Sequence, residues 1–222
     1  MSTDASGAPG NYTIVRRRFV ERLRRAGIRD ARTLDAFEAV PRHRFVPEAL
    51  RDQSYLETPL LIGDGQTISA PGVVAAMTQA LALRGDESVL EIGTGSGYQA
   101  AILSRLAGSV VSVERIPRLA ARARSALDAL GVSNVIVFLG DGTQGRADQA
   151  PYDRVVVTAG GPEIPKPLLE QLAVGGFLVG PFGERDNQHL VRVQRADEGK
   201  YTREVLGRCN FVDLIGRNGW AA

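Results

Sequence analysis

A helical repeat of apolar residues marks the first regular pattern in the chain. Between residues 14 and 26, the apolar side chains that share one helix face are Val15, Phe19, Val20 and Leu23. Gly27 ends this helix, and a second short helix is predicted over 31–40, where Pro41 stops it. We expect the two segments to form an accessory helical layer.

The segments around these helices lack such a repeat. Residues 1–13 are small and polar and contain glycine and proline, which predicts a disordered tail. Residues 52–70 are predicted to form a long loop, because Gly63-Asp64-Gly65 breaks regular structure. A third helix is predicted over 71–83, since proline suits the first turn of a helix.

From residue 88 onward, short apolar runs alternate with helical segments. Strands are predicted over 88–92, 110–114, 135–139, 154–158 and 176–180. Helices are predicted over 98–106, from the second strand to residue 130, and over 165–173. Runs at 190–193 and 201–205 predict a closing hairpin that turns near 197–199. This order predicts an α/β fold with a doubly wound, mostly parallel sheet, an N-terminal helical layer and a C-terminal β-hairpin.

Composition limits the classes of protein that the chain can represent. Hydrophobic residues make up 44% and charged residues 23% of 222 residues, which is ordinary for a soluble domain. Cys209 is the only cysteine, so no intrachain disulfide is possible. The first thirty residues contain no apolar run typical of a secretory signal, so we expect none, and no stretch approaches the roughly 20 apolar residues that a membrane helix needs. We expect a cytoplasmic, monomeric protein with no membrane partner, and no metal site, since His43 and His189 lack cysteine partners.

Arginines concentrate near the start of the chain. The cluster consists of Arg16, Arg17, Arg18, Arg22, Arg24 and Arg25. Acids such as Glu21 and Glu38 dilute it, which favours a solvated helix face with salt links over a nucleic-acid patch. A net charge of only +2 gives no strong argument for a nucleic-acid partner.

The most specific local motif is the segment 89–98, Val-Leu-Glu-Ile-Gly-Thr-Gly-Ser-Gly-Tyr. An apolar strand leads into a glycine loop that opens a helix, which is the setting of a nucleotide site. Its Gly-x-Gly-x-Gly spacing differs from the dinucleotide motif, and no lysine is present for a P-loop. Glu91 at the strand end suits a cationic ligand, so Gly93, Gly95 and Gly97 indicate S-adenosylmethionine binding.

Two further acids follow the next two predicted strands. Glu114 ends the second strand, where an acid can accept hydrogen bonds from both ribose hydroxyls. Asp141 follows the third strand, where its carboxylate can accept a hydrogen bond from the adenine amino group. Because ligands bind at the carboxyl edge of such sheets, the three acids predict one cofactor site. For any one of them, the alternative is a helix cap or a loop residue.

The chain resembles the protein-L-isoaspartate O-methyltransferase family from about residue 14 to about 214. The segment 62–71, Ile-Gly-Asp-Gly-Gln-Thr-Ile-Ser-Ala-Pro, matches the family, and its Gln-Thr-Ile-Ser-x-Pro part is much more diagnostic than the glycine loop, which many methyltransferases share. Further matching segments are Val40-Pro41-Arg42, Phe45-Val46, Ser112-Val113-Glu114-Arg115-Ile116, Gly140-Asp141-Gly142, Val157-Thr158-Ala159 and Pro162-Glu163-Ile164-Pro165.

This resemblance implies a Rossmann-like methyltransferase fold that uses S-adenosylmethionine to esterify the carboxylate of L-isoaspartyl residues in damaged proteins. It implies that Ser69 touches cofactor and substrate carboxylate, and that Thr67, Ile68 and Gly142 help to bind the cofactor. The alternative is that Ser69 only caps the helix that begins at Pro71. The expected organisation is one domain: 14–70 for the helices and substrate loop, 71–185 for the cofactor core, and 186–222 for the hairpin and substrate side.

The sequence departs from the family pattern at a few positions. Gly72 and Val74 stand where some relatives carry histidines, and Thr143 stands where many carry a larger residue. Asp213 replaces proline in a Phe-Val-Pro-Leu segment near the substrate, where an acid can alter the choice of peptide.

Two other functions remain open from the sequence. Related enzymes methylate an aspartate of a biosynthetic peptide, although such relatives often carry long C-terminal extensions. The second alternative is a catalytically silent binding module, against which the intact Glu91, Glu114, Asp141 and Ser69 argue.

Overall fold

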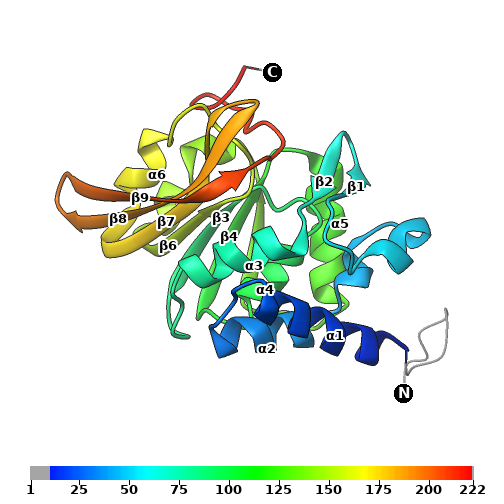
Figure 1. Ribbon diagram of the computed structural model, residues 1–222. Helices are drawn as coiled ribbons and strands as arrows, with labels where there is room; N and C mark the ends of the chain where they lie inside the picture. The colour runs from blue at the N-terminus through cyan, green and yellow to red at the C-terminus, as the bar shows by residue number, and fades with distance from the viewer. Residues whose placement is uncertain (1–10, 222) are drawn as a thin grey trace.

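The computed structural model describes residues 11–221 and is built around a seven-stranded sheet (Figure 1). Its strands lie in the order β5-β4-β3-β6-β7-β8-β9. Their bounds are β3 Ser88–Ile92, β4 Ser109–Glu114, β5 Val135–Leu139, β6 Tyr152–Val157, β7 Leu172–Glu184, β8 Asn187–Asp197 and β9 Lys200–Cys209. The first five strands in this order pair in parallel, whereas β7–β8 and β8–β9 pair antiparallel. The predicted mostly parallel sheet with a closing hairpin is confirmed.

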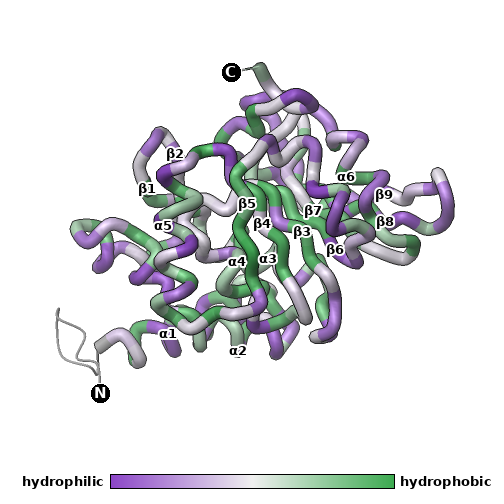
Figure 2. Tube along the Cα trace, turned by 180° about the vertical axis from the view of Figure 1, so that it is seen from behind, coloured by the Kyte–Doolittle hydropathy of each residue, from purple (hydrophilic) through white to green (hydrophobic). Residues whose placement is uncertain are grey.

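Alternate residues of the central strands serve two different cores. On β3, Val89 packs with helix α3 residues such as Met77, whereas Leu90 packs with Leu168 of α6. Both β3 residues are fully buried, as expected for a parallel strand that is covered on both faces. Viewed from behind, β3, β4 and β5 are hydrophobic along their length, which is the pattern that a buried parallel sheet requires (Figure 2).

One face of the sheet carries most of the helices (Figure 1). They are α1 Asn11–Arg25, α2 Ala31–Ala39, α3 Pro71–Ala80, α4 Tyr98–Leu103 and α5 Pro117–Asp128. Phe19 of α1, Phe37 of α2 and Tyr98 of α4 belong to one buried cluster on this side. The N-terminal helices therefore form the predicted accessory layer.

The other face has a thinner cover. It consists of helix α6 Lys166–Glu170, the short 3₁₀ turns η3 Gly142–Gln144 and η4 Ala147–Gln149, and the C-terminal segment. Edge strand β5 is incompletely covered, since Ile136 and Leu139 are exposed. The doubly wound arrangement holds at the centre of the sheet and thins out at this edge.

The prediction of a loop over residues 52–70 is wrong in its second half. Strands β1 Leu60–Gly63 and β2 Gln66–Ile68 form a separate antiparallel hairpin. Asp64 and Gly65 between them have φ values of 52° and 71°, the left-handed pair that a two-residue hairpin turn requires. The turn residues therefore connect two strands instead of ending regular structure. The 3₁₀ turns η1 Arg42–Phe45 and η2 Glu48–Gln53 precede the hairpin.

The first helix begins earlier than predicted. Residues 1–10 of the predicted tail lie outside the described residues, but α1 begins at Asn11. The Tyr12 ring stacks on His43 with 3.9 Å between ring centroids, which anchors this first turn. A tail that reaches residue 13 is therefore wrong at its end, because a tertiary contact extends the helix.

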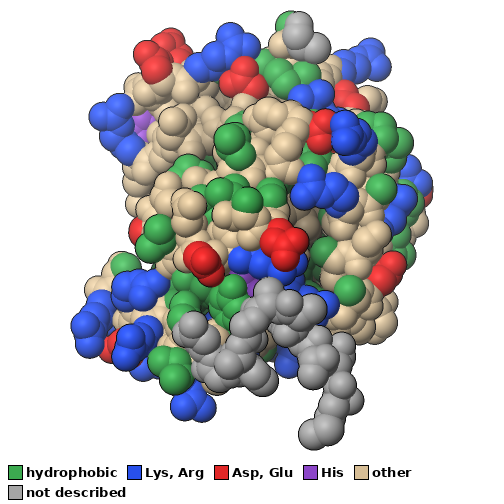
Figure 3. All heavy atoms as spheres, turned by 90° about the vertical axis from the view of Figure 1, so that its right-hand side faces the viewer, with side chains coloured by type: hydrophobic (Ala, Val, Ile, Leu, Met, Phe, Trp, Pro, Cys, Tyr) green, Lys and Arg blue, Asp and Glu red, His purple; other side chains and the backbone are tan. Residues whose placement is uncertain are grey.

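The arginines of α1 meet acids and backbone oxygens. Arg24 and Arg25 both contact Glu21, and Arg17 contacts Glu38. Arg22 donates to the Tyr55 carbonyl at 2.7 Å. Across the face shown in Figure 3, basic side chains are scattered among other groups and do not form one continuous basic area. Within residues 11–221, no helix is long and apolar enough to span a bilayer.

Candidate active site

The glycine loop leaves the carboxyl end of β3 and enters α4. Gly93, Gly95 and Gly97 all have positive φ, at 96°, 53° and 86°. Side chains rarely adopt this region, which explains a glycine at every second position. The Gly93 N–H donates to the Val113 carbonyl at 2.9 Å and thereby fixes the loop against the neighbouring strand β4.

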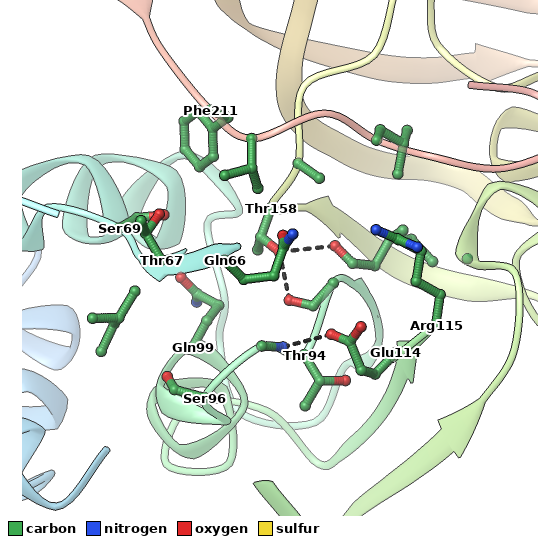
Figure 4. Close-up of a pocket in the computed structure, with 18 of the residues that line it drawn as sticks. Gln66, Thr67, Ser69, Thr94, Ser96, Gln99, Glu114, Arg115, Thr158 and Phe211 are labelled. Atoms are coloured by element: carbon green, nitrogen blue, oxygen red, sulfur yellow. Dashed lines mark hydrogen bonds between the residues drawn. The ribbon is translucent and has the colours of Figure 1, made fainter. Parts of the chain in front are cut away.

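A cavity of about 840 Å³, including its open mouth, lies beside this loop. Figure 4 shows Ser69 on one side, Glu114 and Arg115 on the opposite side, and Phe211 above. Residues that line the cavity come from the β1–β2 hairpin, α3, the glycine loop, the ends of β4 and β6, and the C-terminal segment. Of the predicted site residues, those lining it are Thr67, Ile68, Ser69, Gly93, Gly95, Glu114 and Gly142.

Glu114 presents its carboxylate to the cavity and also holds the loop. Its Oε2 accepts from the Gly95 N–H at 2.8 Å, and its Oε1 accepts from the Ile116 N–H at 2.9 Å. Each carboxylate oxygen can accept a second hydrogen bond, so capacity remains for two hydroxyls of a ligand. The predicted position of Glu114 at the carboxyl edge agrees with this geometry.

Glu91 lies beneath the loop instead of lining the cavity. It is fully buried, and its Oε2 accepts a hydrogen bond from the Ser112 hydroxyl. Burial raises the pKa of Glu91 to about 8, against the effect of the Ser112 hydroxyl and with that of nearby Glu114. The side chain is therefore mostly protonated at neutral pH, and Glu91 is not among the residues that line the cavity. Ser112 also contacts Thr94 at 2.5 Å, and Thr94 lines the cavity.

Asp141 also turns away from the cavity. Its carboxylate accepts from the N–H and the hydroxyl of Thr143 at 2.9 and 2.7 Å, from Gln144 at 3.3 Å, and from the Arg217 N–H at 2.8 Å. Four donors occupy the roughly four acceptor positions of a carboxylate. The predicted hydrogen bond to adenine would have to displace one of them, whereas Gly142 next to Asp141 does line the cavity.

The three loop glycines have different neighbours. A Cβ at Gly97 would lie 3.2 Å from the Ala123 Cβ of α5, so this glycine permits helix packing and does not line the cavity. A Cβ at Gly93 would lie 2.5 Å from the Thr158 hydroxyl. At Gly95 the nearest atom would be Ile62 Cδ1 at 3.5 Å, an ordinary contact. Gly95 therefore has the most room for a ligand on its cavity side.

Ser69 lies where two cavities meet. The second cavity is lined by Pro59, Thr67, Ser69, Ala70, Val73, Asn210, Phe211 and Val212. It shares Thr67, Ser69, Phe211 and Val212 with the first. Helix α3 is preceded by Ala70, and no side chain caps it, so the alternative role of Ser69 as a helix cap is not seen. Ser69 therefore lines both cavities.

Sequence reasoning missed several lining residues. Thr158 donates its hydroxyl to the Ile92 and Gly93 carbonyls at 2.9 and 2.6 Å, and it follows an apolar strand in a segment already noted for its resemblance. Gln99 projects from the first turn of α4 and donates to the Thr78 hydroxyl at 3.1 Å. Neither residue carries a local pattern that separates it from a structural polar residue.

The donors and acceptors of the first cavity fit S-adenosylmethionine. The Glu114 carboxylate faces a space that also has apolar walls, formed by Ile92, Val113 and Ile215. A carboxylate suits ribose hydroxyls, and apolar walls suit an adenine ring. Among the described residues, no group of three or more His, Cys, Asp or Glu side chains that could hold a metal is present.

Enzymes that bind S-adenosylmethionine at the carboxyl edge of a Rossmann-like sheet are the class to which this fold and cavity correspond. The family profile described as protein-L-isoaspartate(D-aspartate) O-methyltransferase matches residues 15–219. The chain belongs to this family, and S-adenosylmethionine is its cofactor.

Close relatives cover nearly the whole chain. Protein-L-isoaspartate O-methyltransferase 1 of Syntrophobacter fumaroxidans is 55% identical over 95% of this chain and 98% of its own length. The protein-L-isoaspartate O-methyltransferase of Geobacter metallireducens is 52% identical over 95% and 98%. A solved protein-L-isoaspartate O-methyltransferase has a TM-score of 0.83 and 29% identity, and covers 92% of this chain and 67% of that one. A Plasmodium falciparum structure in complex with S-adenosyl-L-homocysteine shares the fold, with a TM-score of 0.80, 24% identity, and coverage of 90% and 98%.

Proposed function

We propose that this protein transfers the methyl group of S-adenosylmethionine to the free carboxylate of L-isoaspartyl residues in proteins and peptides. The observation that carries the proposal is the meeting of two cavities at Ser69. One is bounded by the glycine loop and Glu114, and the other is a groove between α3 and residues 210–212. A carboxylate on a peptide in the groove would meet the first cavity at this junction, where Ser69 lines both.

The cofactor half uses groups that are already fixed in place. Glu114 would accept hydrogen bonds from the ribose hydroxyls, while Gly93 and Gly95 bring backbone close to the ligand. Ile92 and Val113 would contact the adenine ring. When bound, S-adenosylmethionine supplies a methyl group on a positively charged sulfur. We propose Thr67 and Ile68, on the other wall, as further contacts of this ligand.

The peptide half needs little acid–base chemistry. A carboxyl group with an ordinary pKa near 4 is ionised at neutral pH, so it can attack without a general base. Among the described residues, neither His43 nor His189 lines the two cavities, which agrees with such a site. The Ser69 hydroxyl would donate a hydrogen bond that orients the carboxylate. Orientation of this kind can contribute on the order of 7 to 11 kcal/mol to catalysis.

The groove itself favours backbone recognition over side-chain charge. Its lining residues are neutral, with apolar surface from Pro59, Val73 and Phe211. Asp213 lines the first cavity, but its carboxylate is paired with Arg185 at 2.7 Å. The acid that replaces the family proline therefore does not stand as an isolated negative charge beside the peptide. We propose that peptides of either charge are accepted.

The test compares matched peptides that differ only in the linkage of one aspartate. We expect S-adenosylhomocysteine release with the isoaspartyl peptide, and at least about 100-fold less with the normal aspartyl isomer. Conversion of the isoaspartyl carboxylate to an amide should abolish release, since no nucleophile remains. Equal turnover of both isomers, or none with the isoaspartyl peptide, would contradict the proposal and favour a different substrate.

A further inference from the structure

Arg42 is a fully buried arginine that contacts the backbone of the site serine. It lies in η1, and its exposed fraction is 0%. Its Nη2 donates to the Ser69 carbonyl at 2.7 Å, and its Nε donates to the Ser54 carbonyl at 2.7 Å. One guanidinium group thus holds together two segments that are separated by the β1–β2 hairpin.

The same guanidinium reaches the cofactor side of the site. It lies over the Tyr98 ring, 4.8 Å from the ring centroid. Tyr98 is the first residue of α4, directly after Gly97 of the glycine loop, and it also lines the first cavity. Arg42 therefore spans from the backbone of Ser69 to the helix that the cofactor loop opens.

Ser69 depends on contacts of this kind for its position. The β1–β2 hairpin is a separate two-stranded sheet, and a hairpin of that size is only marginally stable alone. Ser69 and Ala70 lie between the end of β2 and the start of α3, outside both elements. The hydrogen bond from Arg42 is thus a direct link between Ser69 and the rest of the fold.

Burial of a charged guanidinium costs free energy unless hydrogen bonds and ring contacts compensate for the lost water. Burial lowers the pKa of Arg42, with nearby Tyr98 and Glu57 acting in the opposite direction. Within residues 11–221, no ion pair at 4.0 Å or less joins Arg42 to a carboxylate, and Glu57 instead accepts from the Gly72 N–H at 2.6 Å. Two carbonyl oxygens and an aromatic ring are therefore its partners. A planar guanidinium can donate to both carbonyls and lie over the ring at the same time. A lysine ammonium is a compact point charge and cannot make all three contacts.

We propose that Arg42 is a positioning residue for methyl transfer. It fixes the Ser69 backbone relative to the glycine loop and so sets where the substrate carboxylate meets the cofactor. This inference rests on the proposed function. It adds a residue that touches neither ligand but controls the alignment of both.

The experiment uses the full chain with Arg42→Lys, Arg42→Ala and a matched control, Arg154→Lys. Arg154 is also largely buried and donates to the Leu81 carbonyl at 2.6 Å, but it lies at the start of β6, outside both cavities. We measure kcat and KM on an isoaspartyl peptide, S-adenosylhomocysteine affinity by calorimetry, and melting temperature. Arg42→Ala is also assayed with millimolar guanidinium, which can occupy the vacated space.

Arg42→Lys should lower kcat at least about tenfold, while affinity for S-adenosylhomocysteine changes less than about threefold. Guanidinium should restore part of the turnover of Arg42→Ala and none of that of a Ser69→Ala control. Arg154→Lys should lose stability but retain kcat per folded molecule. The inference is overturned if Arg42→Lys turns over within twofold of wild type, or if Arg154→Lys loses as much kcat. If Arg42→Ala does not fold, Arg42→Lys decides. Failure of the wild-type protein on the peptide would instead refute the proposed function.

Discussion

Gly95 and Glu114 are joined directly, because the Gly95 N–H donates to Glu114 Oε2 at 2.8 Å. The bond links the loop after β3 to the end of β4, two strands that pair in parallel register. Of the three acids predicted to surround the cofactor, Glu114 is the one that lines the cavity. The same carboxylate that would hold the ribose therefore also sets the shape of the loop.

Replacement of Glu114 by alanine should weaken cofactor binding. The variant removes a ligand contact and leaves the N–H groups of Gly95 and Ile116 without their acceptor. We expect a loss of roughly 1 to 3 kcal/mol in S-adenosylhomocysteine affinity, measured by calorimetry. Glu204→Ala is the control, since Glu204 is exposed on β9 and its carboxylate is paired with Arg192 at 3.4 Å, outside both cavities. Equal affinities for Glu114→Ala and wild type would contradict the prediction that Glu114 contacts the cofactor.

Valine at Gly95 should block the cofactor while leaving the fold intact. Valine would be strained at a φ of 53°, and its methyl groups would occupy space beside the cavity that Gly95 lines. Gly131→Val is a matched control, because Gly131 has a φ of 67° and no heavy atom within 4 Å of an added Cβ. Both variants should lose similar stability, about 1 to 2 kcal/mol, from left-handed backbone. Only Gly95→Val should bind S-adenosylhomocysteine at least about tenfold more weakly. Equal binding by the two variants would contradict the prediction that the glycine loop contacts the cofactor.

Glu91 should make stability fall as pH rises. Its pKa is near 8 in the folded state, against an ordinary value of 4.5, so between these values the folded protein holds a proton that the unfolded chain has lost. The free energy of unfolding of the wild type therefore decreases across this window. A glutamine side chain cannot titrate, so Glu91→Gln should gain stability relative to wild type from pH 5 to pH 8, measured by urea unfolding. A gap that does not change with pH would contradict the assignment.

Glu87 provides the control of opposite sign. Burial alone would raise the pKa of Glu87, but the N–H groups of Gly85 and Arg84 outweigh it and lower the pKa below the ordinary value. Its carboxylate thus stabilises the folded state above the unfolded pKa, and this contribution is lost as pH falls through the folded pKa. Glu87→Gln should therefore be most destabilising near neutrality and less so in acid.

The local sequence pattern was sufficient to predict the position of residues that directly follow or end a parallel strand. The loop 93–97 and Glu114 lie at the ends of adjacent strands, so an apolar run followed by glycine or by an acid placed both correctly. The β1–β2 hairpin could also have been predicted, because Asp64-Gly65 is a dipeptide typical of a two-residue hairpin turn.

Long-range contacts decided the cases that sequence reasoning missed. The Asp141 carboxylate accepts one of its four hydrogen bonds from the Arg217 N–H, which lies 76 residues further along the chain. Glu91 is buried within β3 and accepts a hydrogen bond from the Ser112 hydroxyl on the neighbouring strand. The cavity wall formed by residues 211–215 follows no helical or strand repeat, and only the family resemblance drew attention to it. Arg217 and Ser112 are distant in sequence from Asp141 and Glu91, so no local pattern predicts these two contacts.

The most direct measurement is kcat of Ser69→Ala on an isoaspartyl peptide, per folded molecule. Ser69 lies at the junction of the two cavities and caps no helix, so its hydroxyl should matter for turnover and not for stability. We expect kcat to fall at least about tenfold, roughly 1.4 kcal/mol of barrier, with melting temperature and S-adenosylhomocysteine affinity nearly unchanged. Ser69→Thr should lie between the two. Normal turnover by Ser69→Ala would contradict methyl transfer at this junction as described, and the substrate carboxylate would then have to be held by other groups.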